Sequence, residues 1–221
     1  MARRIFEYAD ISFEPLTDEI TEQGRVYTLP DGSRVFSVTT ILGKAMDDGG
    51  LNEWRERVGE DEARKITTQA ARRGTAVHAI CEAYLKNERN YPPDAMPVNI
   101  DMFKRIRPIL DQRIGKIYGV EAPLYSTTLQ TAGRTDLAAD FDSIPSIVDF
   151  KTSRRLKKEE DILKYFLQLT TYSIMFEERT GLTLPQIAVI IGIDDENTQV
   201  FVKKTKDYEA QVREIFSAQR E

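Results

Sequence analysis

Residues 131–155 constrain the fold of this chain more than any other stretch. Two largely apolar segments, 133–141 and 146–151, are separated by Asp-Ser-Ile-Pro at 142–145. Short apolar segments bounded by turn-forming residues are typical of strands in a hairpin. The sequence therefore predicts two adjacent strands joined by a turn over 142–145.

Charged side chains mark the end of the second predicted strand. Because side chains alternate between the faces of a strand, Val148 and Phe150 are expected in the core, with Asp149 and Lys151 on the opposite face. Asp-x-Lys alone is typical of a solvated strand end, but here it ends an apolar strand, where unpaired charge is costly. With Asp136 one strand away, two carboxylates and an ammonium suit a divalent cation and phosphate oxygens.

Three short motifs follow one another in this half of the chain. They are Gly-Arg-Thr-Asp at 133–136, Asp-Phe-Lys-Thr at 149–152 and Gln-Leu-Thr-Thr-Tyr at 168–172. In this order and spacing they resemble the RecB-like exonuclease branch of the PD-(D/E)XK nuclease superfamily. From residue 100 the predicted order of elements, namely helix, three strands, helix and strand, is also that of the PD-(D/E)XK core.

The N-terminal part carries a looser resemblance. Residues 25–38 read as a hairpin around Pro-Asp-Gly at 30–32, followed by a helix that begins near Ser37. Tyr-x-x-Pro-x-Gly followed by Ser-Val-Thr-Thr-Ile-Leu is similar to the N-terminal segment of phage exonucleases and of mitochondrial genome maintenance exonucleases. We therefore expect a hairpin and helical extension in front of the core.

The expected fold class is a mixed α/β (α+β) protein with a restriction-endonuclease-like core, in which helices flank a central mixed sheet. The N-terminal hairpin and helical roof would span residues 1–98, and the nuclease core would span 99–221. Periodicity and turn residues predict helices over 52–71, 74–87, 100–116 and 159–180, strands over 120–125, 184–193 and 198–203, and a closing helix near the C-terminal end.

The resemblance implies a metal site and a catalytic group. Asp136, Asp149 and the backbone carbonyl of Phe150 would bind Mg²⁺ or Mn²⁺. Lys151 would orient or deprotonate the attacking water, or act purely through its positive charge; the sequence is consistent with both roles. Gln168 and Tyr172 resemble the closing motif of the family and would contact the DNA backbone or hold Lys151.

The single histidine and one further acid are candidate metal ligands. A lone helical histidine is typical of a structural residue, but Arg-Arg-Gly-Thr-Ala-Val-His at 72–78 is similar to the first RecB-type motif, in which the histidine reaches the metal. His78 is therefore expected to bind the ion, and Glu82, one turn later, is a weaker candidate. Glu121 stands on the first core strand, where a metal ligand and a structural ion pair are equally expected.

Candidate DNA-binding residues cluster near these motifs, and the net charge of −5 argues against a broad nucleic-acid surface but leaves room for a local basic channel. We expect contacts to phosphate from hydroxyl and guanidinium groups next to the site. These candidates are Arg72, Arg73, Thr152, Ser153, Arg154 and Arg155.

Composition excludes several other classes. The only cysteine, Cys81, leaves no internal disulfide, four-cysteine zinc site or protein-held iron–sulfur cluster. The sequence contains no apolar run of membrane-spanning length and no secretory leader, so we expect a cytoplasmic protein of a bacterial or phage-infected cell. The absence of Gly-x-x-x-x-Gly-Lys-Ser/Thr argues against a nucleotide-driven motor.

The leading hypothesis is a metal-dependent DNA exonuclease that acts on free single-stranded ends in phage or bacterial replication, recombination or repair. Replication or recombination proteins are the expected protein partners. Helices between about residues 40 and 117 would roof the site. A structure-specific endonuclease of the same fold and a non-catalytic DNA-binding module are the alternatives.

Overall fold

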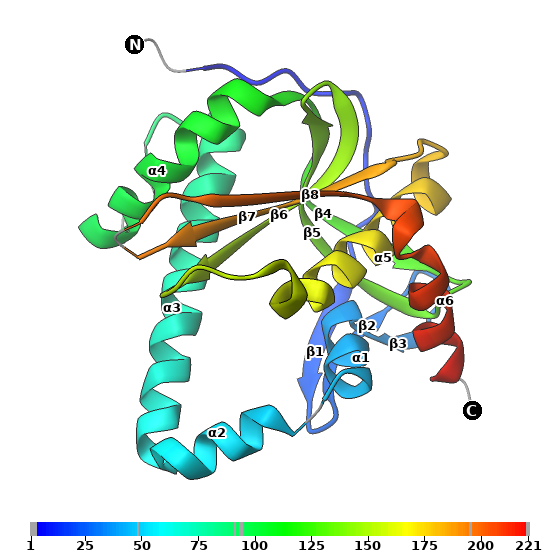
Figure 1. Cartoon of the computed structure of the whole chain (residues 1–221). Helices are drawn as coiled ribbons and strands as arrows, with labels where there is room; N and C mark the ends of the chain where they lie inside the picture. Colours follow the sequence, from blue (N-terminus) through cyan, green and yellow to red (C-terminus); the bar gives the residue numbers. More distant parts are fainter. Residues whose placement is uncertain (1–3, 48, 91, 93–94, 195, 220–221) are drawn as a thin grey trace.

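A five-stranded sheet forms the centre of the computed structural model, which describes residues 4–47, 49–90, 92, 95–194 and 196–219 (Figure 1). Neighbouring strands pair in the order β4-β5-β6-β7-β8. All pairs are antiparallel except β6 with β7, which are parallel and are connected by the helix α5. The bounds are β4 Ile114–Ser126, β5 Thr131–Phe141, β6 Ile144–Ser153, α5 Leu163–Thr180, β7 Gln186–Ile193 and β8 Gln199–Lys204.

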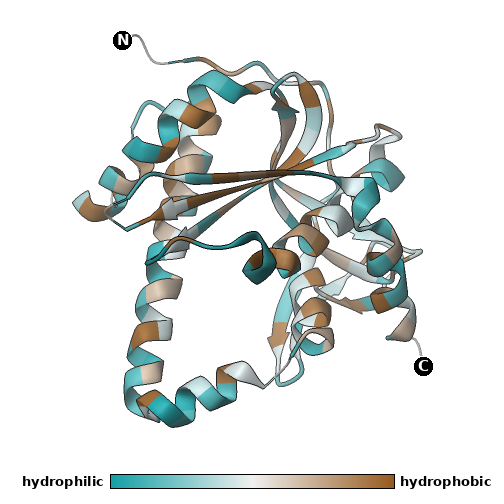
Figure 2. Cartoon of the chain, in the orientation of Figure 1, coloured by the Kyte–Doolittle hydropathy of each residue, from teal (hydrophilic) through white to brown (hydrophobic). Residues whose placement is uncertain are grey.

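Helices cover both faces of this sheet, which confirms the predicted mixed sheet flanked by helices. One face packs against α5 together with α1 (Val38–Ala45) and α6 (Glu209–Ala218). The other face packs against α3 (Glu60–Leu85) and α4 (Pro97–Arg113). Short 3₁₀ turns, Glu159–Ile162 and Thr205–Asp207, precede α5 and α6. The central strands are among the most hydrophobic parts of the chain (Figure 2).

Alternation along β6 divides its side chains between the two cores, as the sequence predicts. Ile147 contributes to the core beneath α5, whereas Val148 and Phe150 contribute to the core beneath α3 and α4. Strand β7 alternates in the same way, with Val189 on the α5 side and Ile190 on the other. Both faces of the sheet are therefore buried around the end of β6.

A small three-stranded sheet contains the predicted N-terminal hairpin, which β2 and β3 form, and adds one strand to it. Its strands are β1 (Thr17–Thr21), β2 (Gly24–Thr28) and β3 (Arg34–Phe36), all antiparallel. The prediction of two strands was incomplete, because β1 is polar and mostly exposed and gives no apolar alternation. A bridge between Ser37 and Ala132 connects the small sheet to the beginning of β5.

The predicted helix boundaries in the N-terminal half were wrong. The break expected between residues 71 and 74 is absent, since α3 continues through Gly74. The chain breaks instead at Gly59, whose φ of +87° ends α2 (Gly50–Val58) and suits a residue without a Cβ. No residue of α2 is buried, and α2 with the first half of α3 extends away from the five-stranded sheet in Figure 1.

Two predicted boundaries in the core were also displaced. Helix α4 ends at Arg113 rather than near 116, and β4 begins directly afterwards. The turn between β5 and β6 consists of Asp142 and Ser143 alone, because Phe141 already pairs with Ile144. Both turn residues have positive φ, +53° and +65°, as a tight hairpin turn requires.

Residues near the N-terminus cover the outer edge of β4. The backbone groups of Glu7 and Ala9 exchange hydrogen bonds with Ile117, at 2.8 and 2.7 Å. A covered edge offers fewer free N–H and C=O groups to other chains. Across the described part of the chain, no helix combines the length and hydrophobicity needed to span a bilayer. The division at residue 98/99 stays a prediction.

Candidate active site

The site lies where β5 and β6 separate. Their described pairing runs from the hairpin turn as far as Leu137 with Val148. Beyond that pair, the backbone N–H of Phe150 donates to Oδ2 of Asp136 at 2.8 Å. A side-chain carboxylate therefore takes the place of a backbone acceptor, and this hydrogen bond fixes Asp136 relative to the end of β6.

Three elements bring candidate metal ligands together around Asp136. One ligand atom each from His78 on α3, Glu121 on β4 and Asp136 on β5 all lie within 4.8 Å of one another. Nδ1 of His78 is 3.3 Å from Oδ2 of Asp136. Glu121 has a φ of +52°, an uncommon value for a residue with a side chain and one found at functional sites. The three predicted ligands thus form one cluster.

Burial and mutual charge perturb this cluster. Burial alone would lower the pKa of His78, but the charge of Asp136 and its hydrogen bond raise the pKa to about 9. Burial raises the pKa of Glu121, and the neighbouring charges of Asp136 and Glu82 raise it further, to about 7. The fold therefore concentrates negative charge where a bound cation would relieve it.

Asp149 belongs to a second group beside this cluster. It is only 3% exposed, and its carboxylate forms an ion pair with Lys151. Gln168 on α5 donates to Oδ1 of Asp149 at 3.4 Å. Burial raises the pKa of Asp149 to about 6, although the positive charge of Lys151 acts in the opposite direction. The charge of Asp136 also acts on Asp149, which places the two groups in one electrostatic site.

Aromatic side chains close this group from the side of α5. Tyr172 is 4% exposed and lies against Gly133, where an added Cβ would meet the phenol oxygen at 2.8 Å. Glycine at 133 therefore leaves the space that Tyr172 occupies. The ring of Tyr165 lies 5.2 Å from Nζ of Lys151, a contact that the sequence prediction missed. Its position one turn before Gln168, on the helix carrying the closing motif, was the available signal.

The cluster opens into a cavity of about 470 Å³ between α3, the small sheet and the beginning of the core. Acidic side chains and one arginine from β2 are among the residues that line this cavity. The lining residues are Arg25, Gly74, Thr75, His78, Ala79, Glu82, Glu121 and Asp136. Sequence reasoning missed Arg25, because no spacing rule relates β2 to a site built from distant elements.

The predicted DNA-contacting residues lie in different surroundings. Arg73 forms an ion pair with Asp194 at 2.6 Å, and only 17% of its side chain is exposed. Arg154 donates to Gln69 of α3 at 3.2 Å. Arg72 lines a separate cavity of about 420 Å³ on α3. Their roles in binding stay predictions.

The hydroxyl candidates follow β6 directly. Thr152 lies opposite α3, since a Cβ at Gly74 would sit 3.8 Å from its Oγ1. Ser153 donates its hydroxyl to the carbonyl of Arg155 at 2.7 Å, so this hydroxyl stabilises the turn that leaves the strand. These contacts fix the chain immediately after Lys151. The DNA-binding role of Thr152, Ser153 and Arg155 stays a prediction.

The fold is thus a mixed sheet flanked by helices, with two aspartates and a lysine where two strands separate. A sequence model of the PD-(D/E)XK nuclease superfamily matches residues 98–221, more than half of the chain, and the chain belongs to this superfamily. PD-(D/E)XK nucleases act on DNA and use divalent metal ions. The predicted family and fold are therefore confirmed.

Solved structures share weaker similarity with the chain. The crystal structure of SSO0001 is 12% identical, with a TM-score of 0.38 over 82% of this chain and 72% of the other. A "putative exonuclease" from Eubacterium rectale is 11% identical, with a TM-score of 0.40 over 66% of this chain and 68% of the other. None of the curated proteins matches the sequence.

Proposed function

We propose that the protein is a Mg²⁺- or Mn²⁺-dependent deoxyribonuclease of the RecB-like branch, which hydrolyses DNA from free single-stranded ends. Its place of action would be the cytoplasm, in bacterial or phage DNA replication, recombination or repair. One observation carries this proposal: the cluster of His78, Glu121 and Asp136 lies beside the ion pair of buried Asp149 with partly buried Lys151.

The donor set fits a divalent cation. The cluster offers one imidazole nitrogen and two carboxylate oxygens within 4.8 Å, and its raised Glu121 pKa reflects negative charge that a cation would offset. Asp149 and the carbonyl of Phe150 would complete the ligands. When bound, such an ion neutralises phosphate charge and lowers the pKa of coordinated water.

Lys151, Gln168 and Tyr172 would each have a different role in the proposed reaction. Burial would lower the pKa of Lys151, but the charge of Asp149 raises it above its ordinary value. Lys151 would stabilise the developing negative charge of the phosphate, or it would orient or deprotonate the attacking water once a bound cation offsets the charge of Asp149. Gln168 would hold Asp149 in place, and Tyr172 would fix the wall formed by Gly133.

The elements on two sides of the cavity, α3 and the small sheet, support a preference for single-stranded ends. Gly74 and Thr75 of α3 line one side and Arg25 of β2 lines another, so both the long helix and the small sheet limit access. Helices α1 and α2 connect these two walls along the chain (Figure 1). A flexible single strand would enter more readily than a duplex.

Cleavage of end-labelled linear and covalently closed circular single-stranded DNA tests this function. With Mg²⁺ or Mn²⁺, the wild type should degrade the linear strand and leave the circle intact, and chelator should stop the reaction. Asp149→Ala and Lys151→Ala should each lower the rate at least about 100-fold, as expected when a charge acting in the transition state is removed. Asp101→Ala, an exposed substitution on α4, is the matched control and should cleave normally.

Other outcomes would select the alternatives. Nicking of the circle would identify an endonuclease of the same fold. DNA binding without hydrolysis under any metal would identify a non-catalytic module. Full activity of the Asp149 and Lys151 variants would contradict the assignment of the site.

A further inference from the structure

The small sheet adds an arginine to the cavity that His78 and three carboxylates line. Arg25 lines this cavity with the cluster residues and with Glu82. Its guanidinium forms an ion pair at 3.3 Å with Asp18 of β1, which does not line the cavity. About half of the Arg25 side chain is exposed. The contact with Asp18 is therefore of the solvated kind that contributes little to stability and exchanges easily.

The backbone of Arg25 is held more firmly than its side chain. Its N–H donates to Oγ1 of Thr40 at 3.1 Å, and its carbonyl accepts from the N–H of Ser37 at 2.9 Å. Ser37 is also the N-cap of α1, because its hydroxyl accepts from the N–H of Thr40 at 3.1 Å. The beginning of α1 thus fixes the residue that enters the cavity, which gives the Ser-Val-Thr-Thr motif a physical role.

Gly24 makes this close approach between β2 and α1 possible. Its φ is +122°, and a Cβ there would lie 2.5 Å from Cγ2 of Thr40. Any side chain at 24 would separate the strand from the helix. This junction therefore requires glycine at position 24.

The guanidinium of Arg25 is paired with Tyr27, whose hydrogen bond is the main cause that raises the pKa of Arg25, as well as with Asp18. Because about half of the side chain is exposed, it can still receive an anion that arrives from solution. Arginine presents several N–H donors in a planar fork that matches phosphate oxygens. A cation beside the cluster cannot itself assist metal binding, since like charges repel. We propose that Arg25 binds a backbone phosphate of the DNA strand next to the one that is cleaved, exchanging Asp18 for that phosphate. This inference rests on the proposed nuclease function.

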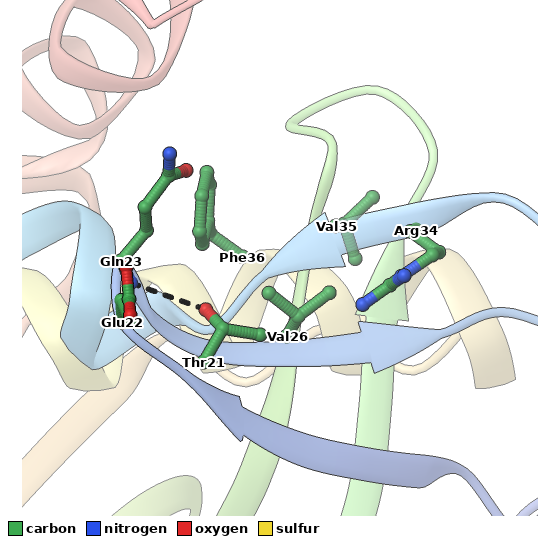
Figure 3. Close-up of a pocket in the computed structure, with 7 residues that line it drawn as sticks. All are labelled: Thr21, Glu22, Gln23, Val26, Arg34, Val35 and Phe36. Carbon is green, nitrogen blue, oxygen red and sulfur yellow. Dashed lines mark hydrogen bonds between the residues drawn. The ribbon is translucent and has the colours of Figure 1, made fainter.

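Arg34 provides a matched control on the same small sheet. It also forms an ion pair with an acid of β1, Glu19, and its side chain is similarly exposed. Register places Arg34 opposite Thr28, on the face of the sheet away from Arg25. There it lines a different cavity with Val26 and Phe36, as Figure 3 shows.

Binding of a fluorescent single-stranded oligonucleotide, measured in chelator so that no hydrolysis occurs, tests the proposal. Arg25→Ala should weaken binding about 10-fold, in line with the loss of a charged hydrogen bond. It should also reduce the slope of log affinity against log salt by about 0.7, the value for one phosphate of a single strand. Arg25→Lys should retain the slope, and Arg34→Ala should stay within about twofold of the wild type.

Asp18→Asn separates phosphate binding from a structural role of the Arg25–Asp18 pair. If Asp18 competes with DNA, this variant should bind the oligonucleotide about two- to threefold more tightly. A purely structural pair predicts weaker binding by both Asp18→Asn and Arg25→Ala. In steady-state cleavage, Arg25→Ala should raise KM more than it lowers kcat.

Three results would overturn the proposal and are distinguishable. If the wild type binds and cleaves DNA but Arg25→Ala keeps its affinity and salt slope, the phosphate contact is refuted while the nuclease function stands. If Asp18→Asn binds as weakly as Arg25→Ala, the pair is structural. A wild type that neither binds nor cleaves would remove the proposed function and this inference with it.

Discussion

Asp136 connects three elements through its single carboxylate. It accepts the N–H of Phe150 on β6, lies 3.3 Å from Nδ1 of His78 on α3, and shares the ligand cluster with Glu121 on β4. Burial would raise the pKa of Asp136, but the positive charge of His78 lowers it below its ordinary value. This carboxylate therefore stays ionised in a partly buried position, as a metal ligand must.

The same charges make the stability of the metal-free protein depend on pH. The folded-state pKa values of Glu121 and His78, about 7 and about 9, exceed their ordinary values of 4.5 and 6.5. A raised pKa contributes stability fully below the unfolded value, and this contribution is lost as the pH rises through the folded value. Stability should thus fall between about pH 4.5 and 7 through Glu121, and between about pH 6.5 and 9 through His78.

Thermal unfolding in chelator from pH 5 to 9 measures this dependence. The melting temperature should fall across the range, and the His78 contribution should be on the order of 3 kcal/mol. His78→Gln should lose the part of the decline that only His78 causes, from about pH 7 to 9. A melting temperature that rises from pH 6.5 to 9 in the wild type would contradict the described charge arrangement.

At the scale of elements, α3 connects α2, which extends away from the five-stranded sheet, to the core of the protein. Its C-terminal half packs against the sheet through buried residues that include Val77 and Ile80. Its middle lines the cavity through Gly74 and His78. A glycine inside a helix costs stability, and at Gly74 it leaves the cavity wall without a side chain.

Gly74→Ala is expected to trade activity for stability. An added Cβ would lie 3.8 Å from Oγ1 of Thr152, an ordinary contact, so the helix should gain about 0.5–1 kcal/mol. The methyl group would also enter the cavity, so cleavage should slow. Gly43→Ala in α1 is the matched control, because its Cβ would lie 3.6 Å from Nζ of Lys164 outside this cavity. It should stabilise the protein with unchanged cleavage; equal activity of both variants would argue against a substrate path along α3.

The sequence predicted an element well when the pattern that defines it lies within neighbouring residues, and poorly when contacts with distant residues define it. The alternation that places Val148 in one core and Asp149 on the other face is a property of adjacent residues, and the sequence predicted it. The length of α3 was mispredicted because Gly74 was interpreted as a helix start, whereas its surroundings tolerate glycine inside the helix. Strand β1 was missed because its pairing with β2, rather than its own polar residues, makes it a strand.

At the scale of the whole molecule, residues from both halves of the chain form one site. His78 precedes the segment matched by the family, whereas Glu121 and Asp136 lie within it. Motifs similar to those of the superfamily made His78 and Asp136 candidate ligands, whereas Glu121 was a candidate only through its place on the first core strand. Alternation along one strand predicted Asp149 and Lys151 on the same face, where they form an ion pair. The position of Arg25 depends on tertiary packing, so the sequence alone did not reveal it.

Calorimetric titration of Mn²⁺, followed by DNA cleavage on the same samples, tests the central claim most directly. Wild type and the exposed control Asp101→Ala should bind the ion and cleave DNA, whereas Asp136→Ala should lose both properties and keep its fold by circular dichroism. An Asp136→Ala protein that binds Mn²⁺ and cleaves DNA like the wild type would contradict the claim that this cluster is the metal site.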